Sequence, residues 1–235
     1  LLYKAFGWEP PRMAHLPLLR NPDRSKISKR KQPTSLNWYR EQGYLPEALV
    51  NFLGLMGFSL PDGRETFTFE DLARGFAFDR ITTTGPVFDL KKLEWLNGTY
   101  VRALAPEALA DRLGPYGASG QDPGRVRAVL PLVHARMKRL SEWGELTGFF
   151  FRDPAVDEAL LKGKRSPGDL RAMLDQAAAE LEGLADFSPA AIESLLRGRQ
   201  EALGWKTGDY FMVLRVVVTG RTATPPLTDT IAVLG

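Results

Sequence analysis

The chain has 235 residues, of which 44% are hydrophobic and 25% are charged, a composition typical of globular proteins. It contains no cysteine and two histidines, which excludes thiol catalysis, disulfides and Cys/His zinc sites, and we expect no metal site. The net charge is +3, and no apolar run approaches the roughly 18 residues that a membrane helix needs. These features predict a cytoplasmic protein that does not enter a membrane.

The positive charges gather in two segments. Residues 20–31 carry six basic side chains against one aspartate, and residues 124–141 carry five Lys or Arg with no acid. Two basic segments far apart in the chain suggest a long anionic partner that is contacted at separate places. Either segment taken alone is more typical of a solvated surface, so the assignment depends on the sequence around it.

The first half of the chain predicts loops and then short helices. Residues 1–35 are rich in proline and charge, which is typical of loops with at most short strands. Helical patterns follow at 46–58, 68–76 and 89–104. The first of these has Pro46 in its first turn, and the second has Thr68 as its N-cap. The expected buried face of the first helix consists of Leu49, Phe52, Leu53 and Met56.

The second half predicts longer helices. After a Gly- and Pro-rich stretch at 114–124, which we interpret as a domain boundary, residues 125–143 show the most regular pattern. One apolar stripe runs along this expected helix, with Pro131 as a kink, and consists of Val126, Leu130, Val133, Met137 and Leu140. Amphipathic segments follow at 168–183 and 188–204, the latter with Ser188 as cap and Gly204 after its end. Residues 209–220 favour a strand by propensity alone.

A short basic motif carries a family resemblance. Residues 26–30, Lys-Ile-Ser-Lys-Arg, resemble the KMSKS signature loop of class I aminoacyl-tRNA synthetases. The stretches on either side, "HLPLLR" and "TSLNWY", are similar to those that flank the signature in bacterial glutamyl-tRNA synthetases. Further similar blocks lie at 85–102 and 213–235, in the same order as in the family. The chain is therefore identified as a member of that family.

The resemblance implies a mainly α fold with three parts. Residues 1–35 would end a class I catalytic domain and carry the signature loop, residues 36–114 would form a mixed stem-contact region, and residues 115–235 would form an all-helical, C-terminally truncated anticodon-binding domain. It also favours a helix over a strand at 209–220. The HIGH motif and the glutamate pocket of the family have no counterpart here, so we do not expect this segment to activate glutamate alone.

The implied activity is ATP-dependent attachment of glutamate to tRNA(Glu) through glutamyl-adenylate. Negative charge must be stabilised on phosphate oxygens as pyrophosphate leaves, a task that suits flexible lysines. By resemblance, Lys29 is the main transition-state contact and Lys26 supports it. The ATP-binding set adds Ser28, Leu18 and Leu19. The implied partners of a monomeric enzyme are tRNA(Glu), glutamate, and ATP with Mg²⁺, the last bound mainly by the absent catalytic domain.

Two groups of residues are implied to bind tRNA. The stem contacts are Lys91, Lys92, Trp95, Asn97 and Arg102, although Trp95 fits a core position equally well. The anticodon contacts are Arg136, Arg215, Thr224, Pro225 and Leu227. In the family, the arginine that corresponds to Arg136 approaches the third anticodon base and separates glutamate from glutamine anticodons.

Other interpretations stay open. The segment could be a stand-alone tRNA-binding module without catalysis, or a non-discriminating glutamyl-tRNA synthetase. A glutaminyl enzyme would replace the helical anticodon region with β-barrels, and a glutamyl-queuosine enzyme would lack that region. The helical periodicity of residues 125–204 argues against both of these.

Overall fold

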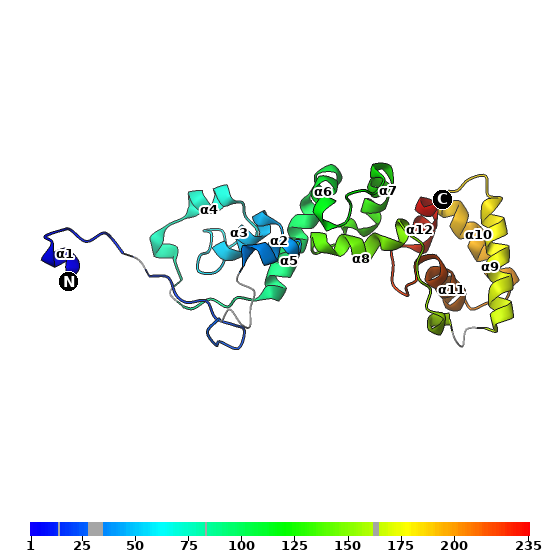
Figure 1. Cartoon of the computed structure of the whole chain (residues 1–235), viewed down its shortest axis with the longest axis horizontal. Coiled ribbons are helices and arrows are strands. Elements are labelled where there is room, and N and C mark those ends of the chain that lie inside the picture. The colour runs from blue at the N-terminus through cyan, green and yellow to red at the C-terminus, as the bar shows by residue number, and fades with distance from the viewer. Residues whose placement is uncertain (14, 28–34, 83, 162–164) are drawn as a thin grey trace. The chain divides into compact units, whose positions relative to one another are not determined.

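The structure is a computed structural model that describes residues 1–235 apart from 14, 28–34, 83 and 162–164. The chain forms two compact units, Leu1–Asn97 and Gly98–Gly235. The described residues form helices joined by turns, with isolated β-bridges in the first unit (Figure 1). The expected mainly α fold is therefore confirmed. In the described part of the chain, no helix is long and apolar enough to cross a membrane.

The first unit starts with a short helix and a long extended segment. Its helices are α1 (Leu2–Ala5), α2 (Leu36–Glu41), α3 (Pro46–Gly54), α4 (Phe69–Gly75), the 3₁₀ turn η1 (Phe78–Arg80) and the first part of α5 (Leu90–Ala103). The Thr68 cap predicted for α4 is confirmed, because its side chain accepts the Asp71 N–H and the Asp71 carboxylate accepts the Thr68 N–H. This backbone hydrogen bond from Thr68 lowers the pKa of Asp71.

The buried face of α3 differs from the predicted one. Pro46 begins the helix as expected, but the helix ends at Gly54, so Met56 lies beyond it. Leu53 is 45% exposed, and the buried side chains are Ala48, Asn51 and Phe52. The prediction was wrong for Leu53 and Met56 because it counted apolar residues alone.

The Asn51 side chain connects α3 to the loop that follows it. Its side chain is fully buried, where Nδ2 donates to the Glu65 carbonyl at 2.9 Å and Oδ1 accepts the Phe67 N–H at 3.2 Å. A buried polar group needs such partners, and the folded chain supplies them from a segment that no local pattern connects to the helix. The position of Asn51 therefore determines which face of α3 lies inside.

The second unit contains the rest of α5 and two groups of helices. The first group is α6 (Pro106–Arg112), η2 (Gly114–Tyr116), α7 (Pro123–His134), η3 (Leu140–Glu142), α8 (Trp143–Thr147) and η4 (Gly148–Phe150). The second is η5 (Glu158–Leu161), α9 (Pro167–Glu182), α10 (Pro189–Ala202), α11 (Thr207–Thr219) and α12 (Leu227–Leu234). Helix α12 packs on both α7 and α10 and so joins the two groups (Figure 1).

The helix expected over 125–143 is interrupted. Helix α7 ends at His134, with Pro131 inside it, and the chain resumes a tight turn only at η3. The Glu142 carboxylate accepts the backbone N–H groups of Lys138 and Arg139, which a continuous helix would use for its own hydrogen bonds. The apolar stripe nevertheless stays buried through Met137 and Leu140.

Residues 207–219 form helix α11, as the family resemblance favoured and strand propensity did not. Its buried side chains are Tyr210, Val213, Leu214, Val216 and Thr219. The first three of these pack in a core with Ile192 and Leu196 of α10. Burial of one helix face outweighs the weak preference of β-branched residues for strands. Burial also raises the pKa of Tyr210, against a smaller lowering effect of Arg199. As predicted, Ser188 caps the N-terminus of α10, and Gly204 follows its C-terminus with φ +63°.

Replacing Asn51 with alanine should destabilise the first unit. The change leaves the buried Phe67 N–H without its acceptor, so the free energy of unfolding should fall by about 1–3 kcal/mol. This loss is measured by unfolding the chain in urea and monitoring hydrogen exchange in peptides from residues 36–75. Asn37→Ala, at an exposed position on α2, is the matched control and should change stability by less than about 0.5 kcal/mol. Equal unfolding midpoints for both variants would contradict the role of Asn51.

Candidate functional site

The segment that leads into Lys26 is held by a turn around Asn21. Asn21 is buried, and its Nδ2 donates to Ser25 Oγ at 2.9 Å and to the Lys26 carbonyl at 3.3 Å. The Asp23 carboxylate accepts the N–H and hydroxyl of Ser25, and Arg24 adopts φ +64°, a conformation uncommon outside glycine. The turn therefore holds the backbone of Lys26 in place while its side chain stays exposed.

The same segment is attached to residues 85–88. The Arg20 N–H donates to the Pro86 carbonyl at 2.9 Å, and the Phe88 N–H donates to the Arg20 carbonyl at 2.8 Å. Glycine at position 85 permits this approach, because a Cβ there would lie 3.0 Å from the Leu18 carbonyl oxygen. Two distant stretches of the first unit are thus joined next to the signature motif.

The predicted ATP contacts fall partly outside the described residues. Ser28 and Lys29 lie there, so their roles stay predictions. The Leu18 side chain is exposed, whereas Leu19 lines an apolar cavity of about 550 Å³ in the first unit. Among the described residues, no group of three or more His, Asp or Glu side chains is placed to hold a metal ion.

The predicted stem contacts of the first unit lie on α5. Lys91 is exposed, and Lys92 forms an ion pair with Glu65. Trp95 is 52% exposed, which favours a surface role over the core role that its pattern also allowed. A half-exposed indole beside lysines is compatible with contact to a nucleic acid.

Asn97 and Arg102 differ from one another in exposure. Asn97 is fully buried, and its Oδ1 accepts the Leu45 N–H at 2.7 Å. Because this side chain has no accessible surface, we assign it a structural role and no longer expect it at an RNA surface. In the second unit, Arg102 is exposed and donates to Thr99 Oγ1 at 3.3 Å. The sequence could not show that Asn97 is buried and Arg102 exposed, because both side chains are polar.

Two arginines predicted to contact the anticodon meet at one loop. Arg136 Nη1 donates to the Thr224 carbonyl at 2.7 Å, and Arg215 Nη1 donates to Thr224 Oγ1 at 2.5 Å and to the Pro225 carbonyl at 3.1 Å. Arg136 follows the end of α7, Arg215 lies on α11, and Thr224 precedes α12. The fold therefore brings together residues that are 88 positions apart in sequence.

The cluster is positively charged and partly open to solvent. Among the residues that the structure describes, neither Arg136 nor Arg215 has an acidic partner. Arg136 is exposed and Arg215 is half-buried. Each guanidinium group has five N–H donors, so donors stay available after the bonds to the loop. Two cations that donate to the same residue, Thr224, form a site suited to an anionic partner with exposed hydrogen-bond acceptors.

The remaining members of this predicted set are buried. Thr224 is 7% exposed, Pro225 is buried, and Leu227 is 4% exposed in the core of the second unit. Their side chains shape and support the loop, which leaves Arg136 as the predicted contact with the most accessible side chain. Whether any of the set binds RNA stays a prediction.

Arg125 is a residue whose role the sequence did not indicate. It belongs to the basic segment 124–141, yet its guanidinium group donates to the Phe150 carbonyl at 3.1 Å and to the Leu234 carbonyl at 3.0 Å. It thus connects α7 to η4 and to the end of α12. The sequence hints at this role only through the position of Arg125 in the first turn of α7. The helix dipole disfavours a cation there, so the side chain needs a specific partner.

The chain is similar to known proteins over its whole length. Residues 1–95 match the family model of the catalytic domain of class I tRNA synthetases (E and Q), and residues 108–235 match the model of an anticodon binding domain. Glutamate–tRNA ligases of Acidothermus cellulolyticus and Thermus thermophilus are each 44% identical over the whole chain. A crystal structure of a glutamate tRNA ligase from Elizabethkingia meningosepticum covers the whole chain at 26% identity with a TM-score of 0.84.

By these matches, the chain contains part of a class I aminoacyl-tRNA synthetase catalytic domain, followed by an anticodon-binding domain. The chain belongs to the glutamyl-tRNA synthetase family. It spans about half the length of the curated relatives that it matches, 49% of the Acidothermus protein and 51% of the Thermus protein.

Replacing Arg215 with glutamine should loosen the loop before α12. The change removes charge-assisted hydrogen bonds to Thr224 and Pro225, which are worth roughly 1.5–3 kcal/mol each when formed to neutral acceptors. Hydrogen exchange of residues 221–234 should accelerate, as measured by mass spectrometry. Arg171→Gln, an exposed arginine of α9, is the matched control and should leave this exchange unchanged. Identical exchange in both variants would show that Arg215 does not hold the loop.

Proposed function

We propose that the whole protein is a glutamate–tRNA ligase, and that this segment supplies its signature loop and its tRNA-binding surface. In this proposal, residues 1–35 end the catalytic domain, residues 36–114 contact the tRNA stem, and residues 115–235 hold the anticodon. The enzyme uses ATP with Mg²⁺, takes glutamate and tRNA(Glu) as substrates, and acts as a monomer. The match of residues 1–95 to a catalytic domain favours a ligase over a stand-alone binding module.

The convergence of Arg136 and Arg215 on the Thr224 loop carries the proposal. A guanidinium group is planar and offers several donors, so it can read the edge of an unstacked anticodon base. The bond from Arg136 to the Thr224 carbonyl limits the directions in which its other donors point. Such preorganisation lowers the ordering cost of recognition and supports a discriminating enzyme.

The signature loop has a separate task in the proposed reaction. The carboxylate of glutamate attacks the α-phosphorus of ATP, the bond to the bridging oxygen breaks, and pyrophosphate leaves with the bonding electrons. Lys29 and Lys26 would stabilise the negative charge on the phosphate oxygens, and Ser28 would add a hydroxyl donor. The turn at Asn21 supports this task, because its hydrogen bonds hold the backbone of Lys26 in place.

Arg136→Gln should remove the anticodon preference of the chain. We expect the unmodified chain to bind tRNA(Glu) more tightly than tRNA(Gln) by about 1–3 kcal/mol, the discrimination that a well-placed arginine gives between bases. The variant should bind both tRNAs about equally, as measured by filter binding at physiological salt. Arg127→Gln, an exposed residue of the same basic segment, is the control and should keep the preference. An unchanged preference in Arg136→Gln would remove its specificity role.

Lys29→Ala should slow adenylate formation in the full-length enzyme. A preorganised donor that acts mainly in the transition state is worth on the order of 10² to 10³ in rate. ATP–pyrophosphate exchange in the presence of glutamate measures this step, and tRNA binding should be unaffected. Lys31→Ala, two residues further along, is the control and should change the rate by less than about tenfold if it contributes only to the surrounding positive field. Equal losses in the two variants would refute a specific role for Lys29.

A further inference from the structure

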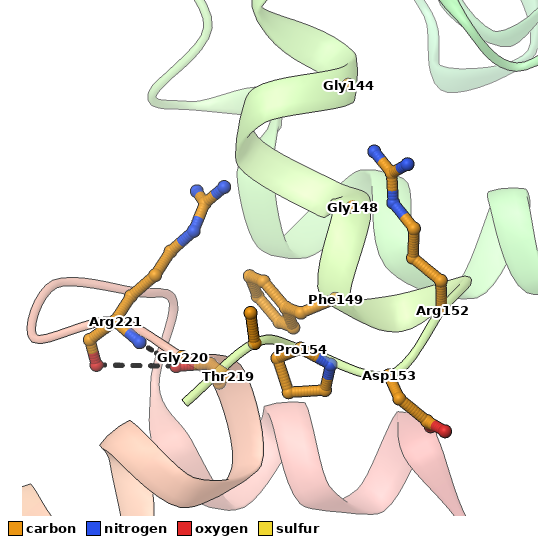
Figure 2. A pocket seen from close by; sticks show the side chains of 10 residues that line it. Gly144, Gly148, Phe149, Arg152, Asp153, Pro154, Thr219, Gly220 and Arg221 are labelled. Carbon is orange, nitrogen blue, oxygen red and sulfur yellow. Dashed lines mark hydrogen bonds between the residues drawn. The ribbon is translucent and has the colours of Figure 1, made fainter. Parts of the chain in front are cut away.

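A polar pocket of about 230 Å³ lies in the second unit, where the end of α8 meets the end of α11 (Figure 2). Arg152 and Arg221 line it from opposite sides, and Phe149 lies between them. The neighbouring backbone is rich in glycine, with Gly144, Gly148 and Gly220. None of the residues that line this pocket is among the predicted ATP, stem or anticodon contacts.

The two arginines give the pocket positive charge, and the described residues form no ion pair with either of them, although Asp153 also lines the pocket. Figure 2 shows both guanidinium groups extending in the same direction along α8, whereas the Asp153 carboxylate points the opposite way. In the described ranges of the chain, neither arginine has an acidic partner. The guanidinium carbon of Arg221 lies 5.7 Å from the centre of the Phe149 ring, a contact that holds the side chain but leaves its N–H donors unused.

Glycines keep the pocket open and fix its shape. Gly144 and Gly148 are four residues apart and so lie on one side of α8 and its continuation, and a Cβ at Gly148 would lie 3.6 Å from the guanidinium group of Arg152. Gly220 ends α11 with φ +70°, and a Cβ there would lie 2.7 Å from the Ala155 carbonyl oxygen. Only glycine fits this position, and it places Arg221 beside the end of α8.

A phosphate group fits these surroundings. Guanidinium groups match the geometry of phosphate oxygens through paired N–H donors. The negative charge nearby comes from the Asp153 carboxylate and from the carbonyl ends of α8 and α11, which contribute at most about half a charge each. The Asp153 carboxylate points away from the two guanidinium groups in Figure 2, so an anion placed beside these groups would meet their N–H donors first.

The position of Arg221 indicates the source of the phosphate. Arg221 is three residues before Thr224 in the same loop, so their Cα atoms are at most about 11 Å apart. A strand of RNA with a base at Arg136 would run close to this pocket. We infer that Arg152 and Arg221 bind a backbone phosphate of the RNA strand whose anticodon base contacts Arg136, an inference that rests on the proposed function. Phosphate contacts set the register of a nucleic acid, and base contacts then specify its sequence.

A double variant, Arg152→Gln with Arg221→Gln, tests this site in the 235-residue chain. Its affinity for tRNA(Glu) and for tRNA(Gln) should fall by the same factor, roughly tenfold at low salt, because a phosphate contact carries no sequence information. The slope of log affinity against log salt should become shallower by about 1. Arg171→Gln, an exposed arginine of the same unit outside the pocket, is the control and should leave both quantities unchanged. Circular dichroism of each variant checks that the helices are retained.

Titration with inorganic phosphate provides a readout that does not depend on RNA. The side-chain NMR signals of Arg152 and Arg221 should shift with phosphate, whereas that of Arg171 should not. Equal salt slopes for the double variant and the unmodified chain, or no phosphate-dependent shift at the two arginines, would overturn the site. If the unmodified chain binds tRNA(Glu) and tRNA(Gln) equally well but still shows the phosphate-dependent shifts, the proposed function is refuted and the anion site stays in place.

Discussion

The Thr224 carbonyl oxygen is the acceptor on which the predicted anticodon surface depends. Arg136 donates to it from the end of α7, and Arg215 donates to the same residue from α11. Two guanidinium groups side by side repel one another, and the loop's oxygen atoms compensate this repulsion by accepting their hydrogen bonds. Because few donors of each arginine are used, the same bonds that hold the loop also orient the donors that remain.

The sequence predicted the helices better than it predicted which side chains they bury. Ser188, Thr68 and Gly204 mark helix ends through local chemistry, and the structure has them in those roles. Asn51 and Asn97, in contrast, are polar residues on helices that bond to distant backbone groups. Their partners lie 14 or more residues away, so no pattern of neighbouring residues could show that both are buried.

Blocks of sequence identified both the family and the residues expected at the anticodon, whereas only the fold shows which of these residues meet. The signature motif could be identified from residues 26–30 and their flanks alone. The meeting of Arg136 with Thr224, and the pocket between Arg152 and Arg221, join segments that are far apart in the chain. The charge pattern alone was misleading for Arg125. It lies in a basic segment that suggested an anionic partner, but its guanidinium group binds backbone carbonyls of the same unit.

The packing of α12 on both α7 and α10 has a consequence for synthesis on the ribosome. Helix α7 is made about a hundred residues before the helix that covers it, and Arg125 cannot reach the Leu234 carbonyl until that residue has left the exit tunnel. Domains generally fold in the order of their synthesis, so the first unit can complete its contacts while the second is still open. Through this interval α6 and α8 can already cover part of α7, whereas the part that α12 covers stays exposed until the last residues of the second unit have been made.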